Sequence, residues 1–351
     1  MNPSTAITSP AVSRSREFAL FLAGGLWVLA ARIAAGHSAN GIATTFQLGM
    51  YESSLAAGFF LFLLLIGFTA IHWIATRRST LRGVNGLPSR PTSGREWGLG
   101  AALGWTLVVL AILPMALLGD LHPSFSFHAS NFGIMLLSLV VLLLVSLTQE
   151  VVFRGYLYMR LKGAIGPVTA TLLMSVIYAV VSAFHPQSTR LSVLIAFLLS
   201  LLFSAAFNRT HALWLPWGLH FAWSASTGVL FGLPTGGSNV YSSIVDTSAY
   251  GSDLMTGGLY GPEGALLTAV VVLVGIPILY RLTRDLAWEY THAPIISAGY
   301  SMDVAPPPAH AAMEQAAAKA VPLVQILTAT PSAPSTMSVI DEHLRSRGDS
   351  E

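Results

Sequence analysis

Residues 147–161 read LTQEVVFRGYLYMRL and place two opposite charges, Glu150 and Arg154, inside a strongly apolar region. Residues four apart in an α-helix share one face, so Arg154 can neutralise Glu150 where water is absent. A carboxylate in a membrane segment is costly, and it points either to a functional site or to an ion pair that fixes two helices. The stretch therefore predicts a membrane helix that carries a reactive group or a buried ion pair.

The composition places the chain in lipid. Of 351 residues, 53% are hydrophobic and 10% are charged, whereas a soluble domain carries about 25% charged residues. The absence of cysteine excludes disulfides, thiolate metal ligands and a cysteine nucleophile. A net charge of +2 does not indicate nucleic-acid binding, because the arginines gather in short loops between apolar spans. We expect an integral membrane protein that is surrounded by the lipid bilayer and has no nucleic-acid partner.

Eight apolar spans make up the body of the chain, and most are close to the roughly 20 residues that a membrane helix needs. The spans cover 18–36, 54–75, 97–118, 133–158, 167–186, 190–207, 212–232 and 262–282. Arginines precede the first span and fill the second loop, whereas the first, third and seventh loops contain no Lys or Arg. The positive-inside rule then places both termini in the cytoplasm. The predicted fold class is an all-α polytopic membrane protein of about eight transmembrane helices with a polar site inside the bundle.

The chain divides into four predicted regions. They are a cytoplasmic N-terminal segment over 1–17, N-terminal transmembrane helices over 18–131, core helices with the polar residues over 132–284, and a mostly disordered cytoplasmic tail over 285–351. The tail is rich in Ala, Pro, Ser and Thr, a composition that does not build a packed core. The first apolar run is long and carries Arg32, so we expect it to be retained as a helix rather than removed as a signal peptide.

Two histidines add to the pair of opposite charges. His185 ends the fifth span before Pro186, which interrupts the helix. His220 lies about eight residues into the seventh span, and Ser224 follows one turn later on the same face. A single histidine in a membrane helix is more often a hydrogen-bonded packing residue than a base or ligand. Together with Glu150, however, the two histidines can polarise a water directly or through a metal, which predicts hydrolysis.

The expected distance between Glu150 and His185 is a difficulty for this site. In a plain zig-zag of helices, Glu150 and His185 lie near opposite ends of their spans, about 20 Å or more apart. They come closer if the fourth helix continues through Tyr158 and if His185 lies in irregular backbone that lines a cavity.

Three stretches of the chain resemble the CPBP family, the intramembrane proteases that include type II CAAX prenyl endopeptidases and bacteriocin-processing or immunity proteins. The family motifs are E-E-x-x-x-R, a second motif that ends in His, and H-x-x-x-N on a later helix. The corresponding stretches here are Gln149-Glu150-x-x-x-Arg154, Phe184-His185, and 212–223 with His220. A further similar stretch lies at 256–264, so the resemblance covers about 136–280. Three motifs in order on separate spans are far more specific than any one of them.

The resemblance implies an intramembrane endopeptidase that uses an activated water to hydrolyse a peptide bond near the C-terminus of a membrane-associated or lipidated protein. It also implies a bacterial cytoplasmic membrane as the location. The implied site residues are Glu150, His185 and His220 as catalytic groups, with Gln149, Arg154 and Ser224 in support. If a zinc ion is bound, His185 and His220 are its implied ligands, and water activation without a metal is equally compatible.

Two positions depart from the family pattern. Gln149 replaces the first Glu of the family pair, and a carboxamide cannot take a proton from water. Ser224 replaces the Asn that would help to hold an oxyanion. These changes favour an alternative, a catalytically impaired relative that acts as a membrane scaffold or self-immunity factor. A transporter with inward polar groups is a third alternative, although the sequence shows no inverted repeat.

Overall fold

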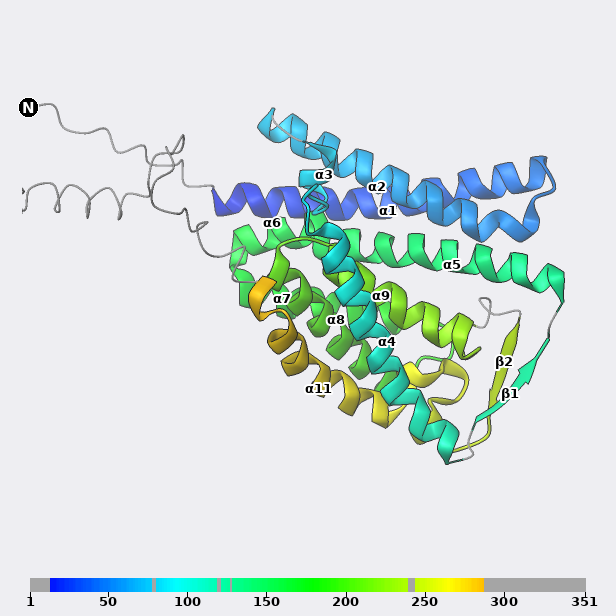
Figure 1. Ribbon diagram of the computed structural model, residues 1–351. Coiled ribbons are helices and arrows are strands. Elements are labelled where there is room, and N and C mark those ends of the chain that lie inside the picture. The colour runs from blue at the N-terminus through cyan, green and yellow to red at the C-terminus, as the bar shows by residue number, and fades with distance from the viewer. Residues whose placement is uncertain (1–12, 78–79, 119–120, 127, 239–243, 287–351) are drawn as a thin grey trace, which may run out of the picture. The chain divides into compact units, whose positions relative to one another are not determined.

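The computed structural model describes residues 13–77, 80–118, 121–126, 128–238 and 244–286 (Figure 1). Most of the predicted N-terminal segment over 1–17 and almost all of the predicted tail over 285–351 lie outside the described residues. The predictions of a cytoplasmic N-terminal segment and of a disordered cytoplasmic tail remain predictions.

Helices dominate the described part of the chain. The α-helices are α1 (Arg14–Thr45), α2 (Glu52–Thr76), α3 (Leu81–Val84), α4 (Ser93–Leu117), α5 (Ala129–Glu150), α6 (Tyr156–Ile165), α7 (Pro167–Ser182), α8 (Arg190–Thr210), α9 (Trp214–Ala225), α10 (Asp253–Thr256) and α11 (Leu266–Leu282). The 3₁₀ turns are η1 (Gly49–Tyr51), η4 (Gly258–Tyr260) and η5 (Pro262–Gly264), and the π-helical turns are η2 (Val151–Gly155) and η3 (Ser226–Leu230).

Each of the eight predicted apolar spans contains one of these helices. Within the described residues, five helices have the length and composition to cross a membrane, namely α1, α2, α4, the run over 131–165, and α8. The helices α7 and α11 are apolar but shorter, with 16 and 17 residues, and α9 has 12. The count of eight membrane spans therefore remains a prediction. The expectation that the fourth helix continues past Tyr158 is confirmed, because α5, η2 and α6 follow one another without a break as far as Ile165.

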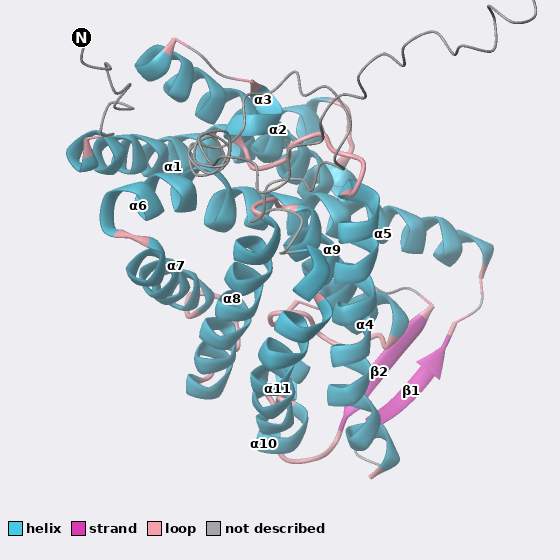
Figure 2. Cartoon of the chain, turned by 60° about the vertical axis from the view of Figure 1, so that its left-hand side comes forward, coloured by secondary structure: helices cyan, strands magenta, loops and turns pink. Residues whose placement is uncertain are grey.

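Two large hydrophobic cores and a small cluster of Leu142, Ala225 and Val229 pack the helices together. In Figure 1, α1 and α2 run side by side, and α1 also packs against α6 and α2 against α5. The core of this first group contains Leu64, Phe68, Tyr156 and Leu161, which are all fully buried. In the second group, α8 contacts α7, α9 and α11, and α4 packs along α9 (Figure 2). Phe203, Leu219 and Trp223 lie in the core of this second group.

The prediction of an all-α protein overlooked a small sheet. Strands β1 (Leu121–Phe125) and β2 (Val245–Ala249) form an antiparallel pair in which Leu121 faces Ala249 and Phe125 faces Val245. The pair lies at the edge of the helices in Figure 2. The two strands are more than a hundred residues apart in sequence, and neither shows a clean alternation of apolar and polar residues. Local sequence patterns therefore gave no sign of the pairing.

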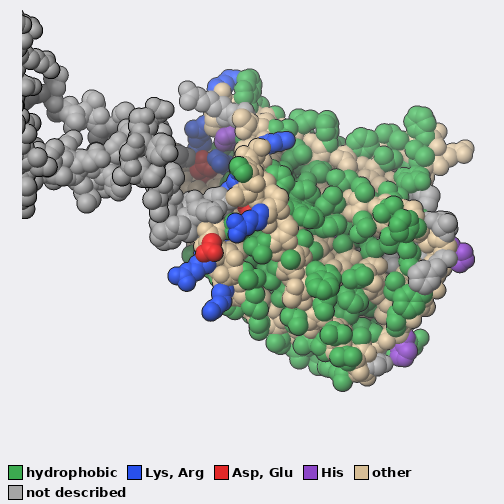
Figure 3. Space-filling view, in the orientation of Figure 1, with side chains coloured by type: hydrophobic (Ala, Val, Ile, Leu, Met, Phe, Trp, Pro, Cys, Tyr) green, Lys and Arg blue, Asp and Glu red, His purple; other side chains and the backbone are tan. Residues whose placement is uncertain are grey.

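The surface separates apolar and charged side chains. Figure 3 shows hydrophobic side chains over most of the visible face and charged side chains at one end of the molecule. Ion pairs join Arg160 to Glu17 at 2.9 Å and Arg90 to Glu96 at 2.6 Å. Large apolar side chains are exposed on the helices, with Leu26 at 70% and Val168 at 71%. Apolar area of this extent in contact with solvent would be unfavourable, and it matches a hydrocarbon surrounding.

Glycines let α4 and α9 approach each other closely. A Cβ atom at Gly104 would lie 2.3 Å from the carbonyl oxygen of Leu219, and one at Gly100 would lie 2.1 Å from that of Leu215. Small residues at helix crossings are a common way for membrane helices to pack, because van der Waals contact replaces the missing hydrophobic drive. Since α9 carries His220, this contact positions the candidate site.

We expect Gly104→Ala to destabilise the protein by about 1–3 kcal/mol, because its methyl group would push α9 away from α4. Gly98 is a matched control on the same helix, since a Cβ there meets nothing within 4 Å. Gly98→Ala should leave stability equal or slightly higher, as alanine is the better helix former. Thermal unfolding in detergent, followed by circular dichroism, measures both. Equal unfolding temperatures for the two variants would contradict the close contact between α4 and α9.

Candidate functional site

The buried pair Glu150 and Arg154 lies where α5 passes into the π-helical turn η2. Both side chains are 0% exposed, and Arg154 Nη1 is 3.4 Å from Glu150 Oε1. Arg154 Nη2 donates to the hydroxyl of Ser200 at 2.7 Å and to its carbonyl oxygen at 3.2 Å. The guanidinium also lies over the rings of Tyr178 and Phe203, at 4.9 and 5.1 Å from their centroids. Arg154 is thereby fixed against α7 and α8, and it holds the carboxylate of Glu150.

His220 completes this cluster from α9. Its Nδ1 lies 2.7 Å from Glu150 Oε1, and its ring stacks on Phe203 with centroids 4.6 Å apart. An ionised carboxylate only accepts hydrogen bonds, so Nδ1 is the donor and the opposite nitrogen, Nε2, is left for another group. Among the described residues, the second oxygen of Glu150, Oε2, has no hydrogen-bond partner. A buried oxygen of this kind is a natural position for an ordered water.

Gln149 and Ser224 lie beside the cluster. The amide oxygen of Gln149 accepts a hydrogen bond of 3.3 Å from the hydroxyl of Tyr178 on α7. Ser224 is buried on α9, one helical turn after His220. Both residues therefore lie beside the cluster. Gln149 does not supply the carboxylate of the family's first Glu, and Ser224 does not supply the amide of the family's Asn.

His185 is the predicted site residue that the structure does not bring to the cluster. The helix α7 ends at Ser182, and the chain then turns through Pro186 before α8 begins. His185 is exposed in this turn, where its backbone N–H donates to the carbonyl oxygen of Ser182 at 3.1 Å. The fourth helix continues past Glu150 as expected, and His185 lies exposed in the turn after α7.

One carboxylate near the cluster was not among the predicted site residues. Glu263 Oε1 accepts a hydrogen bond of 2.8 Å from the indole of Trp223, three residues after His220 on α9. Next to it, the hydroxyl groups of Tyr260 and Ser182 lie 3.0 Å apart. The similarity of the 256–264 stretch to the family was the available signal, but it contains no motif that assigns chemistry to the glutamate.

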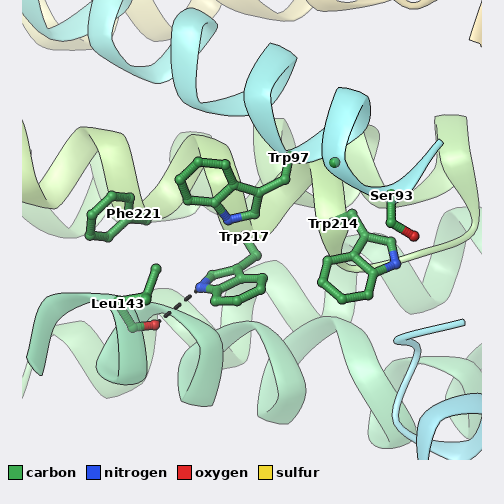
Figure 4. A pocket seen from close by; sticks show the side chains of 7 residues that line it. Ser93, Trp97, Leu143, Trp214, Trp217 and Phe221 are labelled. Atoms are coloured by element: carbon green, nitrogen blue, oxygen red, sulfur yellow. Dashed lines mark hydrogen bonds between the residues drawn. The ribbon is translucent and has the colours of Figure 1, made fainter. Parts of the chain in front are cut away.

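An apolar cavity of about 360 Å³ opens between α4, α5 and α9 (Figure 4). Its lining residues are Ser93, Gly94, Trp97, Leu143, Trp214, Trp217 and Phe221. Trp217 donates from its indole to the carbonyl oxygen of Leu143 at 3.1 Å, and Trp97 meets it edge-on. The cavity thus has aromatic walls held in place by a hydrogen bond, and Trp217 and Phe221 flank His220 along α9.

The described residues do not form a zinc site of three protein ligands. Among them, no group of three or more His, Asp or Glu side chains lies together in a way that could hold a metal ion. His220 uses Nδ1 for Glu150, and His185 is in the exposed turn. A catalytic zinc ordinarily has three protein ligands, so this arrangement does not fit the group.

Glu150, Arg154, His185 and His220 all lie in one segment that is similar to a known protein family. Residues 130–226 match the Rce1-like family of type II CAAX prenyl endopeptidases. No significant match to the chain was found among curated proteins or among solved structures. The family match together with the apolar helices indicates an integral membrane protein, and intramembrane proteolysis is the general kind of activity it supports.

Proposed function

We propose that the protein is an intramembrane endopeptidase that hydrolyses a peptide bond near the C-terminus of a membrane-associated or lipidated protein. The observation that carries this proposal is the buried contact of 2.7 Å between Glu150 and His220. It joins α5 to α9 within the segment that matches the Rce1-like family. A membrane protein has little reason to bury an ionisable pair with one carboxylate oxygen left open unless the pair has a task.

In the proposed reaction, His220 acts on the carbonyl group of the scissile peptide. Glu150 accepts from Nδ1–H of His220. When Nε2 also carries a proton, it can donate to the oxygen that becomes negative when water attacks. Arg154 keeps Glu150 in place and compensates its charge. Ser224, one turn from His220, offers a hydroxyl as a second donor. The open oxygen of Glu150 and the amide of Gln149 are acceptors that can position the attacking water.

The apolar cavity supports a substrate with a hydrophobic anchor. It is lined by aromatic rings, and α9 contributes both to it and to the Glu150–His220 contact. A prenyl or acyl chain in such a cavity gains about 25 cal/mol for each Å² of apolar surface removed from water. We therefore place the lipid part of the substrate between α4, α5 and α9.

We expect the purified protein in detergent to cleave a farnesylated C-terminal peptide with kcat/KM at least about tenfold higher than that of the same peptide without the lipid, a difference of about 1.4 kcal/mol from apolar burial. Release of the terminal fragment, followed by mass spectrometry, measures both rates. Preparations that carry Glu150→Ala control for contaminating peptidases. Cleavage that persists in that variant would not belong to this protein.

A second candidate function is supported by Gln149, Ser224 and the exposed His185. A catalytically impaired relative would keep the helices as a membrane scaffold or self-immunity factor. In that case the wild type is silent towards both peptides, and a cellular phenotype of the protein survives Glu150→Ala as long as the variant inserts normally. The same peptide assay therefore separates the two functions.

A further inference from the structure

Glu263 is held in a fixed orientation at the edge of the candidate site. It lies in η5, just before α11, and its side chain is partly buried. The indole N–H of Trp223 donates to its Oε1 at 2.8 Å, and the backbone N–H of Gly236 donates to the same carboxylate. Two neutral donors from separate parts of the chain thus orient the group without compensating its charge.

Glu263 contacts α9, the helix that carries His220. Residues three apart on a helix share a face, so Trp223 brings the carboxylate to the side of α9 that bears His220. Tyr178, which donates to Gln149, lies one turn before Ser182 on α7. The hydroxyl of Ser182 is 3.0 Å from that of Tyr260, three residues before Glu263. Glu263 and Gln149 therefore border one polar region from different helices.

The proposed hydrolysis needs a group that accepts a proton from the attacking water. Gln149 has an amide, which cannot take a proton from water. Glu150 contacts His220 and Arg154 through Oε1, and its charge compensates the guanidinium of Arg154. Glu263 is a second carboxylate that contacts α9, through Trp223, and its hydrogen-bond donors are neutral.

We propose that Glu263 is the catalytic base of this protein and replaces the carboxylate that is absent at position 149. This inference rests on the proposed endopeptidase function. The water oxygen forms a bond to the scissile carbonyl carbon while its proton moves to Glu263. When the carbon–nitrogen bond breaks, the proton passes from Glu263 to the leaving nitrogen, so that one peptide and one water give an acid and an amine.

The test compares Glu263→Gln with the wild type on the farnesylated peptide. Glutamine keeps an oxygen that can accept from Trp223 and Gly236 but cannot take a proton. We expect kcat to fall by about 10²–10⁴-fold, with KM and the unfolding temperature unchanged. The fall of kcat/KM at low pH, which reports protonation of the base, should be absent from the residual activity of this variant. Asp253→Asn is a matched control, because Asp253 is an exposed carboxylate in the neighbouring α10.

A second variant distinguishes a base from a structural acceptor. Adding Gln149→Glu to Glu263→Gln returns a carboxylate to the polar region. We expect kcat of this double variant to be at least about tenfold higher than that of Glu263→Gln. Activity of Glu263→Gln within threefold of the wild type would overturn the assignment of Glu263 and leave the endopeptidase proposal intact. A loss that Gln149→Glu does not relieve would also overturn it. A silent wild type would overturn both proposals.

Discussion

Substitution of His220 by alanine is expected to lower kcat/KM for peptide cleavage by about 10³-fold or more. The imidazole contacts Glu150 through Nδ1 and leaves Nε2 for the substrate. Its loss removes the proposed donor to the developing oxyanion and leaves Glu150 without that partner. Initial rates on the farnesylated peptide, measured at several substrate concentrations, give the change.

His37→Ala is the matched control for this experiment. His37 is exposed on α1, so its replacement changes the same residue type away from the cluster. We expect its rate to equal that of the wild type. If His220→Ala cleaves as fast as His37→Ala, the endopeptidase proposal at this cluster is wrong.

The largest effect on stability is expected for Arg154→Ala. Removing the guanidinium leaves Glu150 buried beside an empty space, and an uncompensated buried charge costs about 3–5 kcal/mol. The variant also loses the hydrogen bonds to Ser200 and the contacts with Tyr178 and Phe203. Denaturant unfolding in detergent, compared with the wild type at the same detergent concentration, measures the free energy of unfolding.

Glu150→Gln in the Arg154→Ala background separates charge from packing. The neutral amide no longer needs compensation, so we expect the double variant to regain part of the lost stability. A double variant that is no more stable than Arg154→Ala would mean that packing alone explains the loss. Arg154→Ala with wild-type stability would refute the structural role of the ion pair.

The parts of the site that lie on one helix could be predicted from the sequence. Glu150 and Arg154 are four residues apart, and helix periodicity alone places them together. His220 is 70 residues from Glu150, and the order of family-like motifs indicated that it belongs to the same site. The long apolar run also indicated that the fourth helix continues beyond the pair, as it does.

The parts that depend on turns and loops could not be predicted in the same way. The turn after α7 decides that His185 is exposed, and neither hydropathy nor a motif determines such a backbone path. Glu263 comes near His220 only because the segment before α11 folds back towards Trp223. The β1–β2 pair likewise joins distant segments. In the last two cases the deciding contact joins residues far apart in the chain.

The π-helical turn η2 makes the geometry of the site depend on the number of residues in the chain. A π turn contains about one residue more than an α turn, so the helix after it is rotated by about 100° from a plain continuation. Beyond η2, α6 uses Arg160 to bind Glu17 on α1. One residue deleted from 151–155 would straighten the helix and turn α6 away from α1. The extra residue in η2 therefore decides which face of α6 meets α1.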